Sequence, residues 1–249
     1  MMKLTIIGSG AMAIALADGL SNNYKIEFIA RDEKKLKDIS KIFNASYKIL
    51  GDNDITDKNI ILCVKPNALE AVCEELNGSA RAVYSILAGT TLKELKNNIS
   101  SRYTIRAMPN VAAAFGASAT ALTGDEVIKD DAIDIFSKVG ESIWLNSEKE
   151  LDIATAIAGS GPAYLSLVAE ALMDGGVKQG LKRSDSMRFV QVLFGGFAPL
   201  IASNHPALIK DSVMSPAGTT ASGYASLEEG RVRDSFIKAV ESAFKVTQK

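Results

Sequence analysis

The chain has 249 residues, 47% of them hydrophobic, and a formal net charge of −1 at pH 7, so it can form one large or two modest domains. A charge balance this close to neutral argues against a general role in binding nucleic acid or a membrane surface. The single histidine, His205, excludes a histidine triad, and the two cysteines, Cys63 and Cys73, fit neither a disulfide framework nor a metal site. We therefore expect a cytoplasmic protein that holds no metal.

A glycine turn follows the first β-rich run, residues 4–7. Residues 8–13 read Gly-Ser-Gly-Ala-Met-Ala and lead into a predicted helix, which is an accepted form of the dinucleotide fingerprint. Gly8 permits the tight turn, Gly10 lets the backbone approach a pyrophosphate, and Ala13 keeps the helix close to its strand. The predicted cofactor contacts here are Gly8, Gly10, Ala11 and Met12. Residues 1–17 also resemble a signal peptide, but glycines break the apolar run and the charged region is thin.

The end of the second predicted strand, residues 25–30, bears on the choice of cofactor. NAD-binding proteins usually place an acid there to grip the ribose 2′-OH, whereas this chain reads Ala30-Arg31-Asp32. Arg31 offers positive charge to a 2′-phosphate, and we expect Asp32 to cap the next helix. This pattern favours NADP(H), with NAD(H) possible. The alternative for Arg31 is a solvated loop residue.

The first half of the chain alternates short β-rich runs with helical stretches. Further strands are expected at 59–64, 82–86, 103–107, 117–122 and 142–145, and helices at 11–21, 33–43, 68–76, 92–98 and 130–139. Such alternation predicts an α/β fold with a Rossmann-like, doubly wound sheet and right-handed crossovers. Because the pattern changes near residues 146–150, we place an NAD(P)-binding domain at 1–147 and a second domain at 148–249.

The second domain is predicted to be all-helical. Helices are expected at 162–177, 185–201, 207–213, 217–228 and 232–246, with Pro199 bending or ending the second. The apolar run 189–203 looks too short and too interrupted to span a bilayer. About a hundred residues cannot bury this much apolar surface alone. We therefore predict an isologous homodimer, or a higher homo-oligomer built from dimers.

The run 215–220 reads Ser-Pro-Ala-Gly-Thr-Thr and predicts a cradle for a small acid. Pro216 suits the first position of a helix, which Ser215 can cap. The next two amides would then lack helical partners, and such an end attracts a carboxylate. The alternative is an ordinary capped helix. The predicted substrate contacts are Ser215, Ala217, Gly218, Thr219 and Thr220.

Short blocks along nearly the whole chain match one family in order and spacing. They are residues 8–13, Val64-Lys65-Pro66, Ser85–Gly89, Arg106–Asn110, Gly159–Tyr164, Glu170-Ala171 with Asp174, and Lys210–Val213 before Ser215–Thr220. In these blocks the chain resembles the pyrroline-5-carboxylate reductase family. The resemblance implies an N-terminal NAD(P)-binding domain, a C-terminal helical dimerisation domain, and an active site where the nucleotide domain of one subunit meets helices of the dimer.

The resemblance also implies the reaction, which is the reduction of 1-pyrroline-5-carboxylate to L-proline, the last step of proline synthesis. The substrate carboxylate is expected on backbone amides near Ser215–Thr220, with the Thr220 hydroxyl near the imine nitrogen as the catalytic group. A cyclic imine arrives partly protonated, so the nicotinamide supplies hydride and no titrating side chain is required. The chain departs from the family pattern at Ala30 (commonly Asn), Val111-Ala112 (commonly Thr-Pro) and Ala217 (usually Gly). It also has Ser203 where some members place an acid.

Several predicted cofactor contacts follow strands, and each has a structural alternative. Lys65 either faces the ligand crevice or shapes the loop with Pro66. Asn110 either binds the nicotinamide region or forms a turn, and Glu170 with Asp174 more simply joins helices than binds metal. The remaining predicted contacts are Val64, Ala88, Gly89 and Met108. Two other functions stay open: a β-hydroxyacid or ketopantoate type reductase, and a catalytically silent NADP(H)-binding regulator.

Overall fold

A computed structural model describes residues 2–248, which form two compact units. Among the described residues, the first unit contains 2–160 together with 243–248, and the second contains Gly161–Ser242. The first unit holds the glycine turn, and the second holds the run 215–220.

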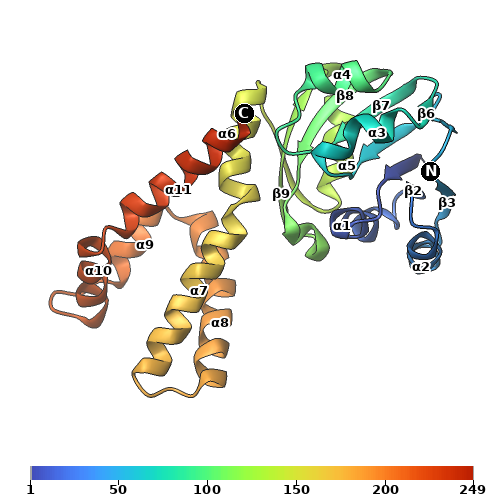
Figure 1. The fold of residues 1–249 in the computed structure, drawn as a ribbon. Coiled ribbons are helices and arrows are strands. Elements are labelled where there is room, and N and C mark those ends of the chain that lie inside the picture. Colours follow the sequence, from blue (N-terminus) through green and yellow to red (C-terminus); the bar gives the residue numbers. More distant parts are fainter. Residues whose placement is uncertain (1, 249) are drawn as a thin grey trace. The chain divides into compact units, whose positions relative to one another are not determined.

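The first unit is built on an eight-stranded sheet in the order β10-β9-β8-β7-β5-β1-β2-β3 (Figure 1). Neighbouring strands are parallel except for β8 and β9, which pair antiparallel. The chain runs from β1 outward in one direction through β2 and β3, then returns to the other side of β1 with β5. This reversal next to β1 is the switch point at which doubly wound sheets bind ligands. The strands are β1 Lys3–Ile7, β2 Lys25–Ala30, β3 Ser46–Ile49, β5 Asn59–Leu62, β7 Ala80–Ser85, β8 Ser101–Met108, β9 Ser118–Gly124 and β10 Gly140–Trp144.

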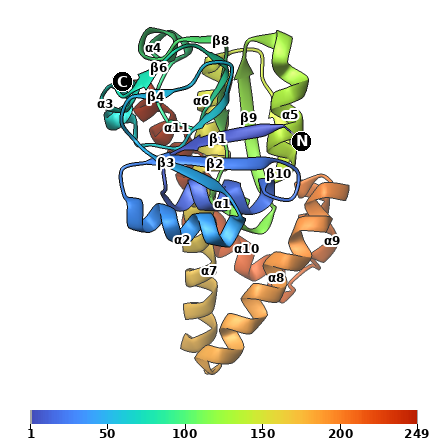
Figure 2. The same cartoon turned by 90° about the vertical axis from the view of Figure 1, so that its right-hand side faces the viewer.

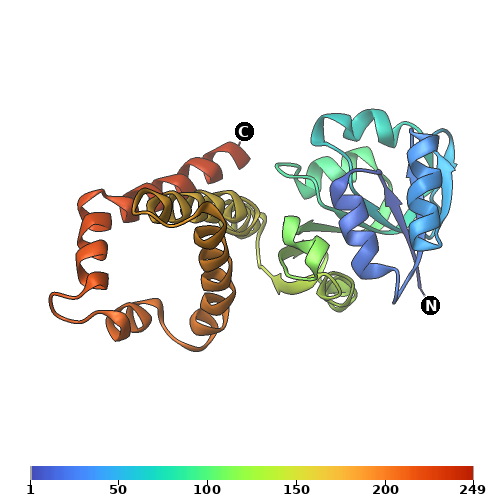
Figure 3. The same ribbon diagram turned by 90° about the horizontal axis from the view of Figure 1, so that it is seen from below.

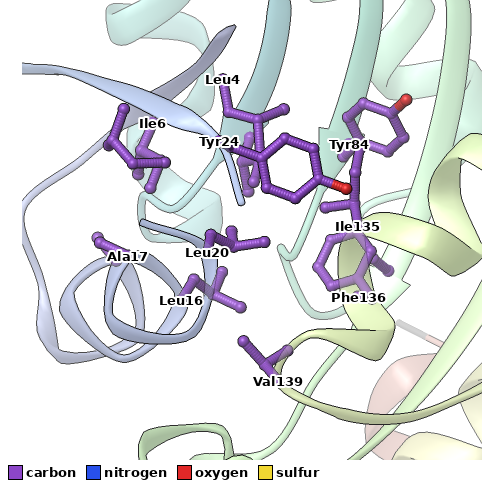
Figure 4. Packing of buried hydrophobic residues seen from close by; sticks show 14 of the residues in the cluster. Leu4, Ile6, Leu16, Ala17, Leu20, Tyr24, Tyr84, Ile135, Phe136 and Val139 are labelled. Atoms are coloured by element: carbon purple, nitrogen blue, oxygen red, sulfur yellow. The ribbon is translucent and has the colours of Figure 1, made fainter. Parts of the chain in front are cut away.

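Helices cover both faces of this sheet, which explains why its strands are apolar on both sides. Alternate residues of β1 point to opposite faces: Leu4 and Ile6 join one core, while Ile7 joins the other. The first core packs against α1 (Ala11–Leu20), α2 (Glu33–Phe43) and α5 (Lys129–Ser137), and includes Leu16, Leu20 and Phe136 (Figures 2 and 4). The second core packs against α3 (Leu69–Cys73) and α4 (Leu92–Asn98).

One charged group, the Glu27 carboxylate, is buried on the face of the sheet that carries the second core. Glu27 of β2 is only 3% exposed and accepts hydrogen bonds from Lys3, Lys58 and the Thr5 hydroxyl at 2.9, 2.9 and 3.0 Å. Burial alone raises the pKa of the Glu27 carboxyl, but the three donors outweigh it and hold the pKa at about 2. The cluster joins β1, β2 and the residue before β5, so it fixes the strands that meet at the switch point.

The second unit consists of helices joined by loops (Figure 3), and α7 (Gly161–Lys178) and α8 (Arg183–Ser203) form a hairpin (Figure 1). Gly176 allows the close contact near its turn, because a Cβ there would lie 2.5 Å from the Ser186 hydroxyl. That hydroxyl donates to the Met173 carbonyl at 2.8 Å, and Asp174 pairs with Arg183 at 2.6 Å. The other helices are α9 Pro206–Val213, α10 Thr219–Glu229 and α11 Val232–Thr247.

The predicted α/β fold class is confirmed, as are all seven predicted strands and all ten predicted helices, with shifts of a few residues at their ends. The short strands β3, β4 (Asn53–Asp54) and β6 (Leu76–Asn77) and the helix α6 (Glu148–Ala154) were not predicted. Pro199 does not end its helix, since α8 continues to Ser203.

Because α8 has 21 residues, the length argument against a membrane span does not hold for it. By length and composition alone, the helical stretches Glu148–Lys178 and Arg183–Ser203 are apolar enough to cross a membrane. This is a weak indication, because helices that pack into the core of a soluble protein pass the same test.

We predict that Glu27→Gln destabilises the first unit by about 1–3 kcal/mol at pH 7, because the partly buried Lys58 loses its charged partner. The folded-state pKa of Glu27 lies below its ordinary value of 4.5. Its stabilising effect is therefore complete above about pH 4.5 and is lost as the pH falls towards 2. Urea unfolding of both proteins at pH 7 and at pH 3 measures the difference, which should shrink at the lower pH.

The control for this experiment is Glu33→Gln, which removes the exposed ion pair with Lys37 on α2. That variant should change the free energy of unfolding by less than about 1 kcal/mol. A Glu27→Gln penalty that is equally large at pH 3 and pH 7 would contradict the assigned titration.

Candidate functional site

A crevice of about 340 Å³ opens at the carboxyl ends of β1, β2 and β5. We call it the β1 crevice. Its position at the switch point is where a doubly wound sheet binds its ligand. Five of the predicted cofactor contacts line it: Gly8, Gly10, Arg31, Val64 and Lys65.

Gly8 fixes the floor of the β1 crevice. Its φ is +124°, and a Cβ at this position would lie 2.4 Å from the Cys63 carbonyl oxygen, so the turn requires glycine. The Gly8 amide donates to the Ile29 carbonyl at 2.8 Å, and the Cys63 amide donates to the Ile7 carbonyl at 2.8 Å. The turn after β1 is therefore tied to both neighbouring strands.

Gly10 opens α1 and leaves space in front of it. A Cβ on Gly10 would meet no atom within 4 Å, and the helix has no side-chain cap. The first amides of α1 are thus available to an anion, as a pyrophosphate site requires. Ala13 is fully buried against the core, in agreement with the close helix packing expected of the fingerprint.

Positive charge lies at the two sides of the β1 crevice. Arg31 is exposed at the end of β2, while Asp32 accepts from the Lys35 amide at 3.0 Å and caps α2, as predicted. The exposed Lys65 precedes a short 3₁₀ turn whose first residue is Pro66. The crevice therefore offers a cation on each side, with the nearby carboxylate of Asp32 engaged in the cap.

Other predicted contacts lie outside the β1 crevice as defined by its lining. Ala88 and Gly89 are exposed in the turn after β7, and Met108 ends β8, where it is 8% exposed and packs with Leu151. Both strands run parallel to β5, so their ends lie on the same edge of the sheet. The predicted cofactor contacts that do not line the β1 crevice are Ala11, Met12, Pro66, Ala88, Gly89, Met108 and Asn110.

Sequence reasoning missed two polar residues of this crevice, Ser9 and Asn67. Ser9 occupies the variable position between the two glycines of the fingerprint, and Asn67 follows Lys65-Pro66 directly. Both residues could have been predicted, because each lies within or next to a motif that the sequence analysis had recognised.

The segment Ser215–Gly218 in the second unit differs from its prediction. It forms a turn in which the Gly218 amide donates to the Ser215 carbonyl at 2.9 Å, and α10 begins only at Thr219. Pro216 is the second residue of this turn, and Ala217, its third, has a φ of +58°. Proline followed by a residue with positive φ is the pattern of a type II turn. Pro216 and Ser215 therefore do not start or cap the helix.

Because α10 begins at Thr219, the amides that an anion can reach belong to later residues than predicted. Gly218 is the N-cap of α10 and brings no side chain to cap it, and its own amide is used in the turn. The amides of Thr219 and Thr220 open the helix ahead of its regular hydrogen bonds. Both residues are exposed, at the first two positions of α10. Ala217 adopts a backbone conformation that glycine adopts at lower cost.

Two family models match separate parts of the chain. A model described as pyrroline-5-carboxylate reductase dimerisation matches residues 148–249. A model described as NADP oxidoreductase, coenzyme F420-dependent, matches residues 3–89. The second range includes the glycine turn and all residues that line the β1 crevice.

Known proteins resemble the chain over almost its full length. The pyrroline-5-carboxylate reductase of Synechocystis sp. is 36% identical over 99% of this chain and 97% of its own. The 1-pyrroline-5-carboxylate reductase structure from Streptococcus pyogenes aligns with a TM-score of 0.88, at 30% identity, covering 99% and 98% of the two chains. A pyrroline carboxylate reductase structure from Plasmodium falciparum, with NADP bound, aligns with a TM-score of 0.83 and 27% identity, covering 99% and 97%. With a nucleotide-type crevice in the first unit and these full-length matches, the chain belongs to the pyrroline-5-carboxylate reductase family.

Proposed function

We propose that this protein reduces 1-pyrroline-5-carboxylate to L-proline with hydride from NAD(P)H, the last step of proline biosynthesis. The observation that carries the proposal is the 36% identity to a pyrroline-5-carboxylate reductase over 99% of the chain. The β1 crevice, with its glycine turn and exposed helix start, supports the nucleotide half of the reaction. When bound, the nicotinamide supplies the hydride.

The protein's own contribution is binding and orientation. The amides of Thr219 and Thr220 at the start of α10 hold the substrate carboxylate, which is favoured there by the helix dipole. The turn Ser215–Gly218 forms the adjoining wall. The Thr220 hydroxyl hydrogen-bonds the imine nitrogen, directly or through a water. Because a cyclic imine is basic enough to arrive protonated, the residues near this end need no strong acid.

The preferred cofactor is NADP(H). Arg31 lies at the end of β2, where the ribose of a bound dinucleotide is expected. It brings a guanidinium instead of the acid that NAD-binding sites usually place there. A related structure, from Plasmodium falciparum, has NADP bound, which also supports NADP(H) as the cofactor. The rest of the cofactor is assigned to Val64, Lys65, Ala88, Gly89 and Met108, because these residues end or follow strands along one edge of the sheet.

The protein acts as a homodimer through residues 148–249, the region that matches the dimerisation model. The second unit leaves large side chains in solvent, with Leu167, Phe189 and Val192 exposed by 65%, 69% and 69%. An apolar groove of about 730 Å³ between α7 and α11 is lined by Tyr164, Leu172 and Phe236 among others. A second copy covers this surface. A mass of 26.5 kDa at all concentrations in sedimentation would contradict the dimer.

We place the boundary between the nucleotide domain and the dimerisation domain after residue 147, next to the start of the matched region. The protein is assigned to the cytoplasm, where its two cysteines, Cys63 and Cys73, stay reduced.

Steady-state oxidation of NADPH tests the proposed reaction. Adding 1-pyrroline-5-carboxylate to the purified protein and NADPH should produce L-proline at the rate at which NADPH disappears. Turnover only with a β-keto acid or ketopantoate would favour the related reductase reaction. Cofactor binding without any turnover would favour a regulator, so each alternative has its own outcome.

We predict that Arg31→Ala weakens NADPH binding about 10- to 100-fold, because a charge-assisted hydrogen bond to the 2′-phosphate is lost. NADH has no such phosphate, so its Kd should change less than about threefold. Fluorescence titration with both cofactors measures the two effects. The matched control is Lys34→Ala, which removes the same charge from the exposed start of α2. Equal losses for NADPH and NADH would remove Arg31 from the discrimination.

We predict that Thr220→Val lowers kcat/KM for 1-pyrroline-5-carboxylate about 10- to 150-fold, because the imine nitrogen loses a hydrogen bond worth roughly 1.5–3 kcal/mol. Valine keeps the β-branched shape, so the fold of α10 should be preserved. Thr220→Ser keeps the hydroxyl and should retain most of the activity. If the valine variant turned over at the wild-type rate, Thr220 would have no part in the mechanism.

A further inference from the structure

A π-helical turn, Thr155–Gly159, joins α6 to α7 at the place where the chain passes from the first unit to the second. The Ser160 amide donates to the Thr155 carbonyl at 3.1 Å, five residues back. The Thr155 hydroxyl in turn donates to the Leu151 carbonyl at 2.8 Å. Such π-helical turns are rare and occur often at functional sites.

Pro162 creates a specific deficit in this turn. In a regular helix the Ala158 carbonyl accepts from the amide four residues later, which here belongs to Pro162. Proline has no N–H to donate. The Ala158 carbonyl, which lies in the π-helical turn just before α7, therefore has no i+4 amide to accept from.

Asn110 supplies the missing donor. Its side-chain Nδ2 donates to the Ala158 carbonyl oxygen at 3.0 Å, across 48 residues of sequence. The half-buried position of Asn110 makes an unsatisfied carbonyl in the same place costly. The contact lies within the first unit and ties the end of β8 to the π-helical turn.

The orientation of the Asn110 amide is fixed from the other side. Its Oδ1 accepts from the Ala112 amide at 3.0 Å, and its own backbone amide donates to the Ser118 hydroxyl at 3.0 Å. One partner of the side chain is a donor and the other is an acceptor, so only one of its two flipped orientations satisfies both. Residue 112 is alanine and so provides the N–H that proline would lack at this position.

We infer that Asn110 is a positioning residue, which replaces the absent Pro162 amide and fixes the π-helical turn that directly precedes the second unit in the chain. In this role it acts through the Ala158 carbonyl and not through the cofactor. The kinetic part of this inference rests on the proposed reduction of 1-pyrroline-5-carboxylate. The structural part stands without it.

A double-mutant cycle of Asn110→Ala and Pro162→Ala tests the structural part. Pro162→Ala restores an N–H that can reach the Ala158 carbonyl, so Asn110 is then no longer needed there. Asn110→Ala alone should lower the folding equilibrium constant about 10- to 100-fold, and at least fivefold less in the Pro162→Ala background. Asn110→Asp keeps the acceptor for Ala112 but has no N–H, and should lose as much as Asn110→Ala. Additive effects in the cycle would overturn the inference.

Kinetics distinguish positioning from cofactor binding. Asn110→Ala should lower kcat/KM for 1-pyrroline-5-carboxylate about tenfold or more, leave the Kd for NADPH within threefold, and recover when Pro162→Ala is added. A rise of more than tenfold in the NADPH Kd that Pro162→Ala does not reverse would make Asn110 a cofactor ligand and overturn the inference. If the wild-type protein does not turn over, the proposed function fails while the unfolding cycle still decides the role of Asn110.

Discussion

The close approach of two backbones at Gly8 is the constraint on which the first unit depends. Its missing side chain lets the turn after β1 lie against the Cys63 carbonyl and bond to the end of β2. This contact places the glycine turn Gly8–Gly10, and with it the start of α1, at the β1 crevice. Arg31 and Lys65 then come to the crevice because they follow β2 and β5 on the same edge. The turn at Gly8 and the order of the strands together place the two cations beside the start of α1.

The second unit follows a different principle, because its helices do not complete a core within one chain. None of the residues described in α7, α9 or α10 is buried, and in α8 only Ser186 and Val190 are. Exposed apolar helices favour contact with another apolar surface, in agreement with the dimerisation model that matches residues 148–249. The proposed catalytic use of α10 and the proposed association of two copies therefore involve the same set of helices.

Sequence reasoning predicted best where a local signal coincides with a tertiary one. The helices α2 and α4 were predicted to the residue, because Asp32 and Thr91 cap them and both helices have an apolar face. The helix α6 was missed although Ser147 and Glu150 have the spacing of a capping box, since the region was read as a boundary.

The start of α10 was misplaced because Pro216 suits both a first helical turn and a type II turn. Only the φ of Ala217, which tertiary structure sets, separates the two. The Asn110 contact to Ala158 joins positions 48 residues apart and has no local signal.

The position of Cys63 beside the glycine turn affects the reactivity of its thiol. Burial raises the pKa of its thiol well above the ordinary range, so the sulfur stays protonated under neutral conditions. Alkylating agents and peroxides attack thiolates, and this sulfur is therefore a poor target for them. The cysteine in the wall of the β1 crevice is therefore a weaker nucleophile than a free thiol at the same pH.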